Sequence, residues 1–309
     1  MARYLGIGKE STYGTPVAAS YYIPIISENL KLEHGYIYPE TVAYRELDKV
    51  IAGKKLVTGG WEQYVTYDKG IGLILKALLG GETKTNPATG VANHVFKKAA
   101  SLPSLTARVG LHDVTEKILH GIGVNELTLE LVAGELLVCT VDCVGEDEST
   151  GTLSTPTFST QDFIDFSKIT TFTLSGTAVT PERLSLTIRN NIDTEAFVLG
   201  SRLLPRLEPT RIEVEGEMDI RFLSTAHLDD FLASTKKDLQ VILRGPQIGA
   251  TGYYNELQID CDEIIYDVGD AYIDRQERIV QGLKFTAIRD TTSAEPIIIT
   301  LQNDEDVEY

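Results

Sequence analysis

The feature that most constrains the fold of this chain is a series of elements that occurs twice. The stretch ENLKLEHGYIY in the first half resembles ERLSLTIRNNI in the second and pairs Leu30 with Leu184. In each half, a long polar stretch, a second alternating stretch and a short apolar segment at helical spacing then follow in the same order. Elements that recur in one order are the signature of a repeated structural unit. We therefore predict two similar domains, residues 1–155 and 156–309.

The match continues beyond the helical segment, although the register changes. Ile71 pairs with Leu228, and NELTLEL from Asn125 pairs with NELQIDC from Asn255. The first half also carries an extra polar stretch, GETKTNPATGVANH, which has no counterpart in the second.

Strand signals dominate both halves. Stretches such as WEQYVTY, LTLELV, RLSLTIR and RIEVEGEMDIRF alternate or are rich in β-branched residues, as half-buried strands do. Only two segments have helical spacing: DKGIGLILKALLG behind a possible Asp68 cap, and STAHLDDFLAST behind Ser224 or Thr225. The fold class expected is mainly β, with one short α-helix in each half.

Composition excludes several classes of protein. The 309 residues have a net charge of −17, so the surface as a whole repels nucleic acid. No apolar run reaches the length of a membrane helix, and no signal peptide is visible, so synthesis in a cytoplasm is expected.

No pattern in the sequence indicates catalysis or a cofactor. The opening GIGKESTYGTP is glycine-rich but lacks phosphate-loop spacing, and Glu10 puts a carboxylate where a phosphate would sit. The histidines are scattered without ligand or triad spacing, and Cys139, Cys143 and Cys261 are expected to be buried free thiols. We expect no enzyme activity, no catalytic residues, no cofactor and no metal.

An acidic stretch, DCDEIIYDVGDAYIDRQE, could be taken for a calcium loop. Asp267, Asp270 and Asp274 are suitable oxygen ligands, but their spacing does not fit the alternate acids of such a loop. The stretch favours a solvated hairpin around a Val-Gly-Asp turn.

The GIGKESTYGTP opening, the long hairpin ending in LVTGGWEQYVTY, and the β-rich halves with one short helix together resemble the tail tube proteins of long-tailed bacteriophages. That resemblance implies β-sandwich or barrel domains whose inner sheets join between subunits into a tube-lining β-barrel. It implies stacked rings in the virion tail, assembled in the host cytoplasm. The tube would give passage to DNA ejected into the host without binding it specifically. Its implied partners are further copies of the chain, the tape measure protein and other tail proteins, with no membrane.

The resemblance also suggests which segments join the rings. The N-terminal arm, residues 1–19, is expected to be poorly ordered until a neighbouring ring binds it, with Lys9, Glu10 and Tyr13 as its contacts. The two long hairpin tips are expected to carry the stacking contacts, at Tyr38, Val42, Tyr44, Phe197, Val198, Leu199 and Leu203.

The resemblance implies a ring of six domains, so a duplicated chain predicts three chains per pseudo-hexameric ring, each with an acidic C-terminal tail at residues 291–309. Two alternatives remain. A related ring protein of the tail, either a terminator or a tail-tip ring, would share all these features. An acidic carbohydrate-binding β-protein is suggested by Trp61, the fourteen tyrosines and the abundant carboxylates.

Overall fold

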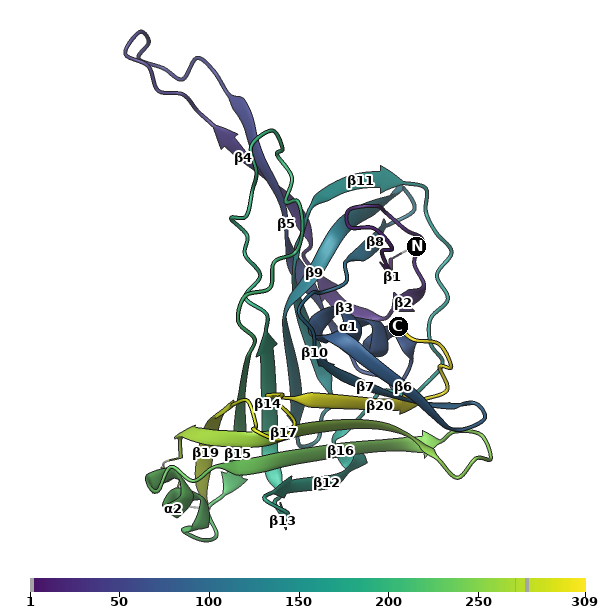
Figure 1. Ribbon diagram of the computed structural model, residues 1–309, viewed down its shortest axis with the longest axis vertical. Coiled ribbons are helices and arrows are strands. Elements are labelled where there is room, and N and C mark those ends of the chain that lie inside the picture. Colours follow the sequence, from purple (N-terminus) through teal and green to yellow (C-terminus); the bar gives the residue numbers. More distant parts are fainter. Residues whose placement is uncertain (1–2, 270, 276–277) are drawn as a thin grey trace.

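The computed structural model describes residues 3–269, 271–275 and 278–309, and most of them lie in antiparallel strands (Figure 1). The mainly β prediction is confirmed. The first half contains β1 (Leu5–Lys9), β2 (Tyr21–Ile23), β3 (Ile25–Glu28), β4 (Lys31–Ile37), β5 (Ile51–Tyr64), α1 (Lys69–Leu79), β6 (Gly80–Ala88), β7 (Val91–Lys98), β8 (Leu105–Leu111), β9 (Thr115–Val132), β10 (Val138–Gly145) and β11 (Asp147–Gly151). The second half contains a 3-10 turn (Phe166–Lys168), β12 (Ile169–Leu174), β13 (Thr177–Ala178), β14 (Pro181–Arg189), β15 (Glu213–Arg221), α2 (Ala226–Leu232), β16 (Lys237–Gln247), β17 (Tyr254–Val268), β18 (Ala271–Arg275), β19 (Arg278–Ala287) and β20 (Ile298–Asn303).

One long sheet, which we call the central sheet, runs through both halves. Its strand order is β4, β5, β10, β9, β14, β15, β19 and β17, and every neighbouring pair is antiparallel. β9 of the first half pairs with β14 of the second from Glu126–Arg189 to Val132–Arg183. The two halves therefore share backbone hydrogen bonds within one sheet.

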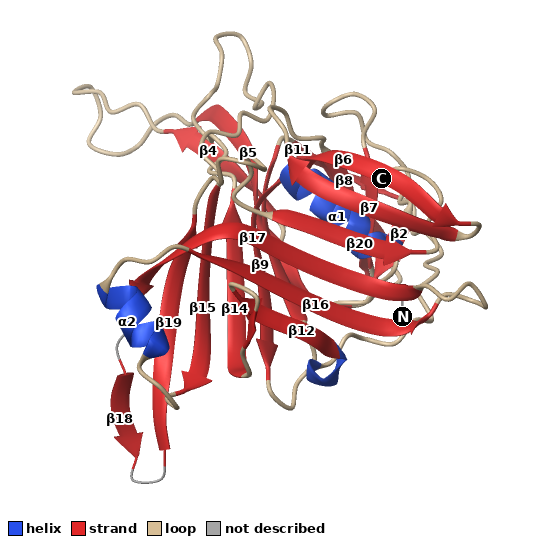
Figure 2. Ribbon diagram, turned by 60° about the horizontal axis from the view of Figure 1, so that its bottom comes forward, coloured by secondary structure: helices blue, strands red, loops and turns tan. Residues whose placement is uncertain are grey.

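The same pairing pattern occurs on both sides of that junction. β9 and β17 are both long strands that leave the central sheet partway along and enter another sheet. There β9 pairs with β8 and β11, and β17 pairs with β16 and β20. β1 then extends the first of these layers beyond β8, as β12 extends the second beyond β16. In Figure 2 the strands β20, β17, β16 and β12 lie across β9, β14 and β15.

The match of Asn125 with Asn255 does not join equivalent positions. Asn125 lies where β9 enters the central sheet, whereas Asn255 lies at the beginning of β17, in the part that pairs with β16. A strand pattern of period two matches equally well at any even shift, so residue letters alone could not fix this register.

The polar stretch that is present only in the first half forms a hairpin, β6–β7. Its strand β7 pairs with β20 from Ala92–Asn303 to Phe96–Ile299. The insert therefore fastens the first half to the last strand of the second.

The two helices begin where the sequence predicts them but differ in burial. The Asp68 side chain accepts a hydrogen bond from Gly70 N–H at 3.2 Å, and the apolar face of α1 is completely buried. α2 contains no buried residue. The three cysteines are free and buried, as predicted.

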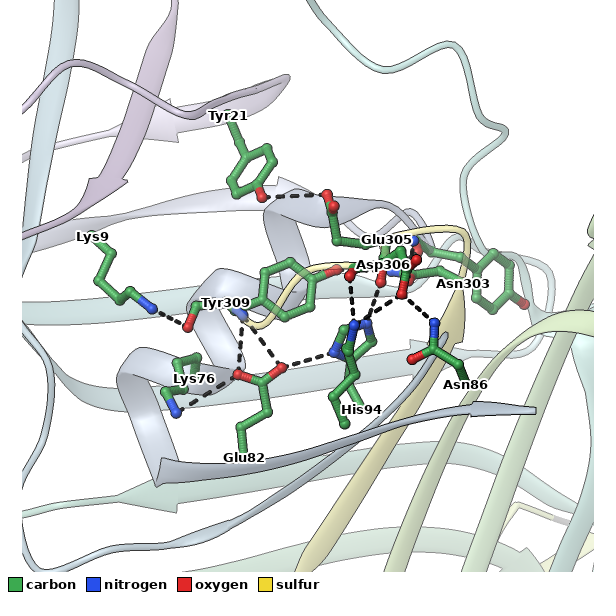
Figure 3. Close-up of polar contacts among 12 residues, drawn as sticks. Lys9, Tyr21, Lys76, Glu82, Asn86, His94, Asn303, Glu305, Asp306 and Tyr309 are labelled. Carbon is green, nitrogen blue, oxygen red and sulfur yellow. Dashed lines mark hydrogen bonds and ion pairs between the residues drawn. The ribbon is translucent and has the colours of Figure 1, made fainter. Parts of the chain in front are cut away.

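The predicted acidic tail, residues 291–309, contains β20, and the segment after β20 packs against α1 (Figure 3). Tyr309 is buried, and its N–H lies 3.1 Å from a carboxylate oxygen of Glu82, which also contacts His94 at 2.8 Å. Lys9 donates to the Tyr309 carbonyl, and a Cβ on Gly72 would lie 2.1 Å from the tyrosine ring. The end of the second half thus completes the core of the first.

The N-terminal segment also differs from the expectation. Residues 1 and 2 lie outside the described residues, but β1 is a buried strand between β2 and β8 rather than a poorly ordered arm. Glu10 is only 7% exposed and accepts hydrogen bonds from Gly14 N–H, Gly121 N–H, Ser104 and Thr106 at 2.6–2.9 Å. The glycine and threonine content of this segment suggested disorder. Residue content does not reveal the distant partners that hold the segment in place.

Within the described residues of the acidic stretch 260–277, β17 and β18 do not pair with each other, so the predicted hairpin around the Val-Gly-Asp turn is wrong. β17 and β18 both pair with β19, one after the other, so β18 continues the line of β17. Asp270 lies outside the described residues, between the two strands.

We predict that Glu10→Ala destabilises the monomer by about 2–4 kcal/mol, because it leaves several buried donors without an acceptor. Urea unfolding followed by circular dichroism measures this. The matched control is Glu40→Ala, at an exposed position, which should change the free energy of unfolding by less than about 0.5 kcal/mol. Equal stability of the two variants would contradict the assigned role of Glu10.

Candidate assembly and channel surfaces

The two faces of the central sheet differ in chemistry. One face is apolar and packs into the core through residues such as Leu129, Leu186 and Met218. The other face is polar, because strands that are buried on one side alternate in polarity. Its carboxylates outnumber its cations: Glu33, Glu62, Glu126, Glu130, Asp142, Glu213, Glu215, Glu217, Asp219 and Asp267 stand against Lys31, Arg183, Arg189, Arg221 and Lys284.

Arginines on this polar face sit between carboxylates of two neighbouring strands. Arg189 on β14 contacts Glu126 of β9 at 2.5 Å and Glu215 of β15 at 2.6 Å, and these contacts raise its pKa. Arg183 contacts Glu130 of β9 at 2.9 Å and is 3.7 Å from Glu217 of β15. Each guanidinium is therefore neutralised locally and is held at the junction of the two halves.

Two carboxyl groups of the polar face have pKa values above the usual range, mainly because they are partly buried. Burial is the main cause that raises the pKa of Asp219. Arg183 opposes this shift, and the neighbouring Glu217 adds to it. Burial likewise raises the pKa of Asp142. The polar face is a surface of negative charge.

The central sheet has two open edges. Among the described residues, β4 pairs only with β5, and β18 pairs only with β19. An edge strand presents unpaired N–H and C=O groups that can pair with another chain. These edges lie at the two ends of the strand order, one from each half.

Two long connections, which we call the arms, leave the same end of the central sheet. The first arm (residues 38–50) joins β4 to β5, the second arm (residues 190–212) joins β14 to β15, and Figure 1 shows both projecting at the top. The second arm is held against the beginning of β5. Lys54 pairs with Glu195 and lies 4.6 Å from the centre of the Phe197 ring, and Arg202 donates to the Gly53 carbonyl at 2.6 Å.

The predicted stacking residues divide into two groups. Tyr38, Val42, Tyr44, Val198 and Leu199 are exposed on the arms. Phe197 and Leu203 are half-buried, and Phe197 serves the bracing contact with Lys54. The structure adds exposed apolar residues that the sequence analysis missed: Tyr36, Ile37, Leu47, Val50 and Ile51. Tyr36 and Ile37 end β4 and Ile51 begins β5, whereas Leu47 and Val50 lie in the first arm.

The residues of the N-terminal segment that were predicted to contact a neighbouring ring are Lys9, Glu10 and Tyr13. All three lie within the first half. Lys9 contacts the carbonyl of Tyr309, and Glu10 is buried as described. Burial, with Glu146 and Glu10 nearby, raises the pKa of Tyr13.

Other chemistry is poorly supported by the described part of the chain. Its residues contain no group of three or more His, Cys, Asp or Glu side chains that could hold a metal ion. No helix within it is long and apolar enough to cross a membrane. Trp61 is 3% exposed and donates to Gln63 at 2.8 Å, so it offers no stacking face to a sugar.

A family model described as "Phage tail tube protein" matches residues 2–287, which is nearly the whole chain. No curated protein matches the chain.

We predict that the double change Tyr44→Asp and Leu199→Asp leaves the monomer folded, because both side chains are exposed, and prevents end-to-end association of rings. Thermal unfolding should shift by no more than about 2 °C, and negative-stain microscopy should show single rings. The control Tyr44→Phe with Leu199→Met keeps the apolar surface and should keep long assemblies. Long assemblies formed by the double Asp variant would contradict this role of the arms.

Proposed function

The chain belongs to the phage tail tube protein family, and we propose that it is a structural protein of the virion whose rings stack into the tube of a phage tail. The observation that carries this proposal is a continuous sheet with one apolar face, one acidic face and two open edges. Such a sheet has both edges available for pairing with further copies of the chain.

The ring is proposed to contain three chains. The support for this is that the order β4, β5, β10, β9 resembles the order β14, β15, β19, β17, and that β9 already pairs with β14. The equivalent step from one chain to the next would join β17 and β18 of one copy to β4 of its neighbour. Pairing of these edges removes the exposed backbone groups and closes the ring. Three chains would then supply six similar units.

The polar face is proposed to line the channel. Its excess of carboxylates repels the phosphates of DNA, and Arg183 and Arg189 are already engaged by glutamates. DNA would therefore slide past without being held on its way into the host. The tape measure protein and other tail proteins are the further proposed partners. A terminator or tail-tip ring remains the second reading, and it predicts single rings instead of tubes.

The first test is the number of chains in one ring. Native mass spectrometry of single rings, released by the double Asp variant, should give three times the 34.0 kDa chain mass. Image averages should show threefold symmetry, with the β6–β7 insert on alternate units. A mass of six chains would contradict the trimer. The proposed structural role would still stand if the chain formed a tube with any number of chains per ring.

The second test concerns the lining of the channel. Glu215→Cys, on the polar face, should react with a bulky maleimide–polyethylene glycol in the free chain but not in assembled tubes. Thr89→Cys, at the exposed turn of β6–β7, should react in both states. The native cysteines are buried and add little background. Equal labelling of Glu215→Cys in free chains and tubes would show that the polar face points outward.

A further inference from the structure

Residues 304–309, which we call the strap, cross from the end of the second half to the first half. They follow β20 and contact β6, β7 and α1, and the Tyr309 ring lies in a place that Gly72 leaves open because it has no side chain (Figure 3). Tyr309 is 3% exposed and Glu305 is 8% exposed. The strap therefore adds a join between the halves that is separate from the pairing of β9 with β14.

A completely buried histidine holds the strap in place. His94 on β7 directs both ring nitrogens at oxygen atoms: Nδ1 lies 2.8 Å from Glu82 Oε1, and Nε2 lies 2.9 Å from the backbone carbonyl oxygen of Glu305. The Tyr309 ring packs against the imidazole, with 4.8 Å between the ring centres. The strap thus covers His94 and is hydrogen-bonded to it.

Both of these oxygen atoms act only as acceptors. A carbonyl oxygen has no proton to donate, and Glu82 is held as a carboxylate because its Oε2 also faces the Tyr309 N–H at 3.1 Å and the Lys76 ammonium at 3.7 Å. A neutral histidine has one N–H and one bare lone pair, so in either tautomer it would direct that lone pair at an acceptor. Only the imidazolium, with two N–H donors, satisfies both oxygens.

We propose that the strap is controlled by one proton: it is seated while His94 is an imidazolium, and it releases when the ring loses that proton. Release leaves His94 in contact with water, where an ordinary histidine is mostly neutral above about pH 7. The seated state therefore binds one proton more than the released state, so rising pH favours release. This property belongs to the single chain and does not depend on the proposed function.

Charged groups of both signs surround the strap. The cations are Lys9 of β1, Lys76 of α1 and Lys84 of β6, and the carboxylates are Glu82 of β6 with Glu305 and Asp306 of the strap. Lys84 and Asn86 lower the pKa of Asp306, and His94 adds to this effect, as a cationic ring does.

The tyrosines at the strap do not compete with His94 for the titration. Burial raises the pKa of Tyr309, and burial together with Glu305 raises the pKa of Tyr21 to about 12. Both hydroxyl groups therefore stay protonated at the pH values used below. Histidine is the side chain whose charge ordinarily changes between about pH 5 and pH 8, and His94 is the histidine that contacts the strap.

Hydrogen–deuterium exchange of the free chain tests the inference. A peptide spanning residues 302–309 is followed at several pH values, and each exchange rate is divided by the intrinsic rate at that pH. Because release sheds one proton, the protection of the strap should fall about tenfold between about pH 7.5 and pH 8.5. Protection of residues 183–189, which lie between two strands of the central sheet, should not change. Equal protection of the strap at both pH values would overturn the inference.

Matched variants separate the proton from the packing. His94→Gln offers an amide that cannot change its charge, so the protection of its strap should be the same at both pH values. His34→Gln, at an exposed histidine of β4, should keep the tenfold change. A tenfold change that persists in His94→Gln would also overturn the inference. The profile of the unsubstituted chain needs no variant, so it decides the question if His94→Gln fails to fold.

Discussion

The pairing of β9 with β14 is the interaction on which the rest of the structure depends. It turns two similar sets of strands into one sheet and gives that sheet a single continuous core on its apolar face. Arg183 and Arg189 strengthen the junction from the polar side by bridging glutamates of the flanking strands. The β7–β20 pairing and the burial of Tyr309 add a second connection between the halves. Both halves are thereby joined in one sheet whose edge strands, among the described residues, are β4 and β18.

Much of this fold could be predicted from the sequence, because strands and helices leave periodic signals. The buried stripe of α1 and its Asp68 cap follow directly from residue spacing, and the insert was visible as a polar stretch in one half only. Register could not be predicted, since the alternation around Asn125 and Asn255 fits several alignments. Long-range partners were also invisible: Glu10 is held by Ser104, Thr106 and Gly121, which are far from it in sequence.

The candidate surfaces could likewise be predicted only where they depend on local sequence and not on long-range partners. Exposed apolar residues such as Val42 and Leu199 stand out because they lie in long connections between strands. Phe197 has the same character in the sequence but is half-buried and contacts Lys54, a partner that only the folded arms bring near. The acidic face could not be predicted without knowing which strands are neighbours in the sheet. A net charge of −17 says that carboxylates are abundant, and only the sheet order places them together.

The central claim is that the open edge of β4 pairs with another copy of the chain when the protein assembles. Hydrogen–deuterium exchange of a peptide spanning residues 31–37, compared between free chains and tubes, tests it most directly. We expect about half of the β4 amides to become strongly protected on assembly, because the others already face β5. Amides of residues 183–189, which lie between two strands within one chain, should be protected in both states. Unchanged exchange in β4 would show that the sheet does not continue from chain to chain.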